Sequence, residues 1–111
     1  MDQVIKEKWI AALESGEYKQ CHGQLSYNDG FCCLGVLTDL YLKETNQEWN
    51  QRGILREHGG LNKLVQEWSG LDSFLPAVPI VSGRVALHNL NDCEKQSFQY
   101  IADILKQVDP V

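Results

Sequence analysis

Apolar residues recur every three to four positions in several segments, which is the period of a helix with one side facing a core. In residues 3–15 the apolar positions on one face are Ile5, Trp9, Ala12 and Leu13. Asp2 can cap the beginning of this segment and Ser15-Gly16 can end it. The pattern therefore predicts a helix over residues 3–15.

The most apolar segment covers residues 31–43 and follows the turn signal Asn28-Asp29-Gly30. Such a run is compatible with a buried strand or a buried helix, and we favour a helix because of its length. Helical spacing is kept by Cys33, Leu34, Leu37, Leu40 and Tyr41. Apolar residues on nearly every side predict a central helix, with Asn28 or Asp29 as its N-cap. Gly35 within it is interpreted as a close-packing contact.

Two more helices are predicted over residues 61–68 and 97–108, the second with Ser97 as its N-cap. The polar residues 44–60 predict a loop. Two hairpins are predicted from short extended segments, which are 17–21 with 24–27 and 78–81 with 84–87. Their turns would be His22-Gly23 and Ser82-Gly83. Helices and short antiparallel strands in this order predict an α+β fold in one domain, residues 1–111.

Composition and charge narrow the classes of partner. The chain has 111 residues, and its ten Lys and Arg are outnumbered by fifteen Asp and Glu, which gives a net charge of -5. The basic residues are scattered, so nucleic acid is not expected as the main partner. No apolar run reaches the roughly 18 residues of a membrane span, and no apolar signal segment follows the N-terminus. We therefore expect a protein of the cytoplasm with no membrane partner.

The four cysteines are interpreted as reduced thiols, because Cys32 and Cys33 are adjacent within an apolar run. Neighbouring helical residues point about 100° apart, and no C-x-x-C motif is present, so neither zinc nor another cofactor is expected. Cys21 is the best candidate nucleophile, but His22 would point to the other face of a strand. His58 or His88 would have to serve as its base, and an incidental strand cysteine is the simpler interpretation.

Residues 87–92 carry several polar side chains just before the helix predicted at 97–108. A helix N-terminus favours an anionic ligand, and Arg84 lies close in sequence. We expect the first hairpin to lie against this segment and to contribute to the same ligand site. The residues of this hypothetical site are Tyr18, Gln20, Arg84, His88, Asn91 and Asp92. The alternative is that Asn91 and Asp92 tie down the loop and cap the helix. No residue is assigned a catalytic role.

Several strings resemble a family of small uncharacterised proteins of bacteriophages and some bacteria. They lie in residues 9–20, 31–40, 64–70, 90–92 and 97–103, and Phe31-Cys32-Cys33-Leu34-Gly35-Val36-Leu37 is the most specific. The chain departs from the family pattern at Tyr100, where an acidic residue is usual, and at Cys21-His22, where small and basic residues are usual. The resemblance implies a phage accessory protein and implies no particular activity.

These observations favour a non-enzymatic binding protein of the host cytoplasm. Its partner would be a host protein or a small anionic ligand such as a nucleotide, with a role in countering host defence. One alternative is a small hydrolase that depends on Cys21 or Asp92 with a histidine. Another is a structural protein whose self-association into a homo-oligomer buries Trp49, Trp68 or Phe74.

Overall fold

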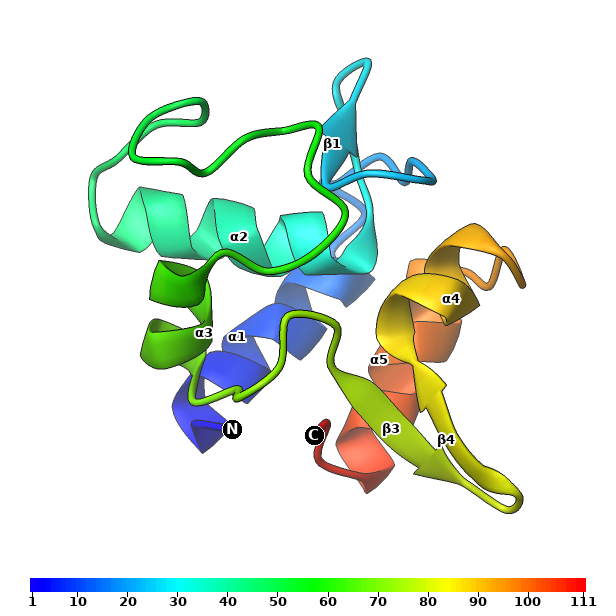
Figure 1. Ribbon diagram of the computed structural model, residues 1–111. Coiled ribbons are helices and arrows are strands. Elements are labelled where there is room, and N and C mark those ends of the chain that lie inside the picture. The colour runs from blue at the N-terminus through cyan, green and yellow to red at the C-terminus, as the bar shows by residue number, and fades with distance from the viewer.

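The computed structural model describes residues 1–111 and contains five helices and two small antiparallel sheets (Figure 1). In chain order the elements are α1 (Gln3–Glu14), β1 (Ser26–Tyr27), β2 (Gly30–Phe31), α2 (Cys33–Glu44), α3 (Lys63–Ser69), β3 (Ala77–Ile80), β4 (Gly83–Ala86), α4 (Leu87–Asp92) and α5 (Phe98–Gln107). The strands pair only as β1 with β2 and β3 with β4. The predicted α+β class is confirmed.

Helix α2 lies at the centre of the fold and contacts α1, α3, α4 and β2. Cys33 through Asp39 form an unbroken buried stretch, as the apolar run predicted. The predicted N-cap was wrong: the cap is Cys32, whose Sγ accepts a hydrogen bond from the Gly35 backbone N–H at 3.3 Å. Asn28 and Asp29 are occupied elsewhere, because both adopt left-handed backbone angles in the preceding turn (φ 51° and 65°).

Helices α1 and α5 pack against each other, and both present their apolar stripes to one continuous core. Trp9, Ile101 and Leu105 are fully buried there. The ends of the chain meet beside this pair: the Lys6 ammonium donates to the Val108 carbonyl at 3.0 Å and to Asp109 at 2.6 Å. The first and last helices are therefore held together by both apolar and polar contacts.

The first hairpin lies further along the chain than predicted. Residues 17–21 and 24–27 do not pair; Ser26 pairs with Phe31 and Tyr27 with Gly30. The turn is Asn28-Asp29 because two residues with positive φ in succession match the twist of a two-residue hairpin. Gly23 also has a positive φ, of 92°, but it is followed by no strand that pairs back.

The remaining elements follow the sequence prediction closely, except that the short helix α4 was not predicted. The second hairpin forms between β3 and β4, with Ile80 paired to Gly83. Helix α3 begins two residues late because the side chain of Asn62 caps it, accepting from the Leu64 N–H at 2.9 Å. Ser97 caps α5, as predicted, through the Tyr100 N–H at 3.1 Å. The predicted loop at 44–60 contains no helix or strand beyond the end of α2.

The central place of α2 makes a prediction about Leu37, which is fully buried. Leu37→Ala removes core contacts and leaves a cavity, so it should lower the free energy of unfolding by about 2–5 kcal/mol. Urea denaturation followed by circular dichroism measures this. A cost below about 1 kcal/mol is typical of a surface position and would contradict the central packing.

Candidate functional site

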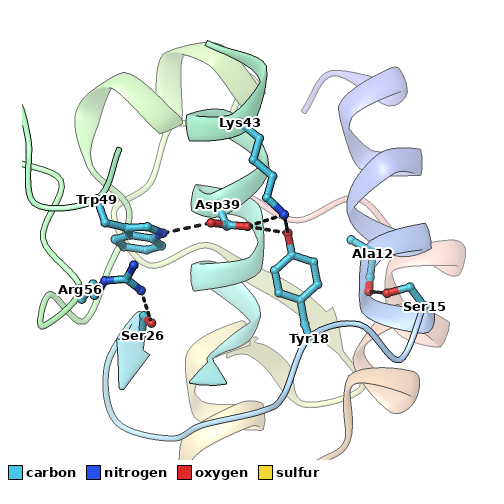
Figure 2. Close-up of polar contacts among 8 residues, drawn as sticks. All are labelled: Ala12, Ser15, Tyr18, Ser26, Asp39, Lys43, Trp49 and Arg56. Carbon is cyan, nitrogen blue, oxygen red and sulfur yellow. Dashed lines mark hydrogen bonds and ion pairs between the residues drawn. The ribbon is translucent and has the colours of Figure 1, made fainter. Parts of the chain in front are cut away.

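Asp39, on the central helix, is the hub of a polar cluster drawn from three segments (Figure 2). Its carboxylate accepts hydrogen bonds from the Tyr18 hydroxyl at 2.7 Å and from the Trp49 indole N–H at 3.0 Å. Lys43, one helical turn further along α2, forms an ion pair with it at 3.1 Å. Tyr18 follows α1 and Trp49 follows α2, so this one carboxylate ties both connecting segments to the central helix.

The electrostatics of the cluster suit a structural role. Burial raises the pKa of Asp39, but the hydrogen bonds from Tyr18, Trp49 and Lys43 outweigh burial and hold that pKa below its ordinary value. Burial and the neighbouring Asp39 carboxylate raise the pKa of Tyr18. The phenol therefore stays protonated and acts as a donor, and the carboxylate stays charged.

An aromatic row leads from this cluster to Arg56. The rings of Tyr18 and Phe31 meet edge to face with centroids 5.2 Å apart, and Phe31 is 6.1 Å from Trp49. The Arg56 guanidinium lies over the Trp49 ring at 5.0 Å and donates to Ser26 Oγ at 2.9 Å (Figure 2). Trp49 is thus held by Asp39 through its indole nitrogen while its ring positions Arg56.

Arg56, which is exposed, also lines the one cavity of the structure, a depression that is largely open to solvent and has a volume of about 510 Å³. Its lining residues are Gln24, Ser26, Tyr27, Asn28, Asn50, Leu55, Arg56 and Glu57. One wall comes from β1 and its turn, and the other comes from the loop after α2. Backbone hydrogen bonds join the walls, from the Leu25 N–H to the His58 carbonyl at 2.8 Å and from the Ser26 N–H to the Arg56 carbonyl at 2.9 Å.

The charge of Arg56 has no carboxylate partner. The ion pairs of the protein are formed by four lysines, Lys6, Lys8, Lys43 and Lys106, and none involves an arginine. The guanidinium makes a single hydrogen bond, to Ser26, so its other N–H donors remain free. A cation that is positioned but unpaired at a cavity wall is suited to an anionic group.

The structure brings together three of the six residues of the predicted ligand site. Gln20 donates to the Asn91 side chain at 2.7 Å, and Asn91 donates to the Cys21 carbonyl at 2.8 Å and to Asp92 at 2.7 Å. Asn91 is fully buried, so these bonds tie residues 20–21 to α4. This is the role that the alternative interpretation gave to Asn91.

The other three make no hydrogen bond with that group, although His88 lies about one turn before Asn91 and Asp92 on α4. Tyr18 belongs to the Asp39 cluster, Arg84 is exposed on β4 and His88 is on α4. Residues 87–92 precede the N-terminus of α5, as expected, but they also form the short helix α4, which was not predicted. None of the six lines the cavity.

The thiols are poorly placed for nucleophilic chemistry. All four cysteines are free, and burial raises the pKa of Cys32 to about 12 and that of Cys33 well above its ordinary value. Burial also raises the pKa of Cys21, whose Sγ contacts the Gln24 carbonyl at 3.6 Å and no histidine. No group of three His, Cys, Asp or Glu side chains is arranged to hold a metal ion.

The depressed pKa of Asp39 predicts a pH-dependent part of the stability. A carboxyl whose pKa is lower in the folded than in the unfolded state stabilises the fold above its unfolded value of about 4. That contribution is lost as the pH falls through the folded value. Asp39→Asn should therefore cost about 2 kcal/mol at pH 7 and lose less stability than wild type on acidification, as urea titrations across pH 3–7 would measure.

Asp72→Asn is the matched control, because Asp72 is exposed and makes no ion pair. It should leave both the stability at pH 7 and the acid dependence unchanged. Equal acid dependence in wild type and Asp39→Asn would show that the Asp39 cluster does not hold the fold together.

The fold and the cavity define a class: a small α+β domain with one polar cavity that carries an unpaired arginine. Residues 1–109 match the family described as Domain of unknown function (DUF8296), and the chain belongs to this family. No curated protein and no solved structure matches the chain. None of its helices has the length and apolar character needed to cross a bilayer.

Proposed function

We propose that this protein is a non-enzymatic binding protein that holds a small anionic ligand in the cavity at Arg56. The observation that carries the proposal is the unpaired guanidinium, positioned by Trp49 and Ser26 at the cavity wall. Arginine is suited to phosphate and carboxylate groups because its planar fork can donate two parallel hydrogen bonds. Holding the fork in place beforehand lowers the entropy lost on binding.

Binding has more support than a hydrolase that depends on Cys21 or Asp92. A nucleophilic thiol needs a lowered pKa and a neighbouring base, and Cys21 has neither. Asp92 accepts a hydrogen bond from Asn91, within the contacts that tie α4 to residues 20–21. Neither residue lines the cavity.

Self-association has less support than ligand binding. Trp49 is engaged with Asp39 and Arg56, and Trp68 packs edge to face on Tyr41 at 5.4 Å. Of the three aromatic residues considered for such an interface, Phe74 alone is largely exposed, at 55%. Light scattering at increasing protein concentration measures whether an oligomer forms.

The resemblance of residues 31–40 and 90–103 to small phage proteins supports a further part of the proposal. The protein would be a phage accessory protein that acts in the cytoplasm of the host, with the anionic ligand, or a host protein, as its partner. A role in countering host defence follows if that ligand is a nucleotide used in signalling.

The test measures thermal stabilisation by inorganic phosphate and by sulfate. A ligand that binds only the folded state raises its stability by about 2.7 kcal/mol at a concentration 100 times its Kd. We expect phosphate to raise the melting temperature of wild type, and Arg56→Gln to abolish the shift while keeping the fold. Arg84→Gln is the matched control, because Arg84 is exposed on the distant β4 strand.

Two outcomes would overturn the proposal. If no anion shifts the melting temperature, the protein does not bind a small anion. If the shift is equal in wild type and Arg56→Gln, the anion does not bind at Arg56. Loss of the shift in Arg84→Gln alone would instead favour the site first predicted around residues 84–92.

A further inference from the structure

The cavity is much larger than the anionic group that Arg56 would hold. Its volume of about 510 Å³ falls in the range of about 300–1,000 Å³ that is typical of sites for whole small molecules. A single phosphate or carboxylate next to Arg56 would leave most of the cavity unfilled. The remaining wall residues therefore indicate what the rest of the ligand is.

An aromatic surface is available on one wall. Tyr27, the residue after Ser26, lines the cavity and is 64% exposed, so its ring is accessible to a ligand there. The structure gives its ring no aromatic partner, whereas Tyr18, Phe31 and Trp49 all pack within the aromatic row. A free aromatic face in a cavity is suited to stacking with a planar ring.

Side-chain amides form the rest of the polar wall. Asn28 makes no hydrogen bond through its side chain, and Gln24 uses only its Nε2, which donates to the Ser26 carbonyl at 2.7 Å. The Asn50 side-chain oxygen accepts one long hydrogen bond, from the backbone N–H of Arg56 at 3.4 Å. An amide offers a donor beside an acceptor, and this pattern matches the hydrogen-bonding edge of a nucleobase.

The charge of the cavity limits how many anionic groups the ligand carries. Arg56 is its only cation, and Glu57, which forms no ion pair, lines the same cavity. A chain of phosphates would place further negative charge beside Glu57, which costs free energy. A ligand with one phosphate and several hydrogen-bond donors satisfies both side chains, because Glu57 can accept from a ribose hydroxyl or an exocyclic amine.

We propose that the cavity binds a nucleoside monophosphate, with the phosphate on Arg56 and the base stacked on Tyr27. The inference rests on the proposed function and names its ligand class. Figure 2 shows the part of the site on which it depends, the guanidinium held between the Trp49 ring and Ser26. The Asp39 cluster keeps Trp49 in place and acts on the ligand only through it.

The experiment is isothermal titration calorimetry of the full chain with adenosine, guanosine, cytidine and uridine monophosphates. Ribose 5-phosphate serves as the matched ligand, since it carries the phosphate and sugar without a base. We expect at least one monophosphate to bind about tenfold or more tightly than ribose 5-phosphate, because stacking on an aromatic side chain contributes that much.

Three variants separate the parts of the site. Tyr27→Ala should remove the preference for the base and leave the affinity for ribose 5-phosphate, whereas Tyr27→Phe should keep both. Arg56→Gln should lower the affinity for all phosphate ligands about tenfold or more. In wild type we expect a monophosphate to bind more tightly than the matching triphosphate. Glu57→Gln should reduce this difference in affinity. Circular dichroism checks that each exposed substitution leaves the fold intact.

Different binding results would contradict the nucleotide proposal and the anion-binding proposal. Equal affinity of wild type for the monophosphates and ribose 5-phosphate would overturn the nucleotide and leave the anion site standing. A base preference that survives in Tyr27→Ala would overturn the stacking. Tighter binding of the triphosphate would overturn the limit to one phosphate, and no binding of any phosphate ligand would overturn the proposed function as well.

Discussion

Gly35→Ala should leave the protein unfolded, or destabilise it by about 3 kcal/mol or more, although it adds a single methyl group. A Cβ at Gly35 would lie 1.8 Å from the Leu25 carbonyl oxygen, a distance at which two atoms cannot coexist. The oxygen cannot retreat easily, because Leu25 is buried and the same carbonyl accepts the Cys32 N–H at 3.0 Å. Far-UV circular dichroism and urea denaturation measure the effect.

Gly59→Ala is the matched control for this substitution. A Cβ at Gly59 would meet nothing within 4 Å, and its backbone is not left-handed, so the stability should change by less than about 0.5 kcal/mol. If Gly35→Ala folds with near-normal stability, the close approach of α2 to the segment before β1 is not as the structure describes it.

Trp9→Ala should lower the free energy of unfolding by about 4 kcal/mol, the largest loss expected from truncating a side chain in this core. Trp9 is completely buried, and its indole N–H donates to the Cys33 carbonyl at 3.0 Å. The substitution removes a large apolar contact between α1 and α2 and also one hydrogen bond. Urea denaturation followed by circular dichroism measures the loss.

Two further variants show where the loss of stability in Trp9→Ala comes from. Trp9→Phe keeps an aromatic ring and removes the hydrogen bond, so its cost should be clearly smaller than that of Trp9→Ala. Val4→Ala lies on the same helix but at a position that is 61% exposed, and its cost should stay below about 0.5 kcal/mol. Equal costs at positions 4 and 9 would contradict the packing of α1.

The helices were the elements most readily predicted from the sequence. The apolar spacing of residues 3–15, 31–43 and 97–108 reports which face of each helix is buried, and this is a local property of the chain. The cap at Ser97 was predicted for the same reason, since it depends only on the next three residues. The second hairpin could also be predicted, because its two strands are joined by a short turn and pair with each other.

The first hairpin and the cap of α2 show where local signals compete. Both His22-Gly23 and Asn28-Asp29-Gly30 are turn signals. Which of them closes a hairpin depends on the strand that pairs back, and Phe31 pairs with Ser26 while also bridging to Gln20. Once Asn28 and Asp29 form the turn, the helix begins later and Cys32, a residue seldom expected as a cap, takes that place.

Part of the candidate site could have been anticipated. Asp39 is the only acidic residue in the largely apolar run at 31–43, and Lys43 follows it at the helical spacing of an ion pair. A charge that is predicted to be buried requires a partner, so a polar cluster around Asp39 was inferable. Its other partners, Tyr18 and Trp49, carry no sequence signal that connects them to Asp39.

The sequence by itself determined the periodic helices, the α+β class and the burial of Cys32 and Cys33, because these depend on spacing and composition over short distances. Tertiary structure alone decided the cavity, since one wall is β1 with its turn and the other is a loop about thirty residues later, and the two meet through backbone hydrogen bonds from residues 25 and 26 to residues 58 and 56. It also decided that Arg56 lies at the cavity wall without a carboxylate partner, because a guanidinium is available only where no carboxylate lies beside it. That condition is a property of neighbours in space, which the order of residues does not specify.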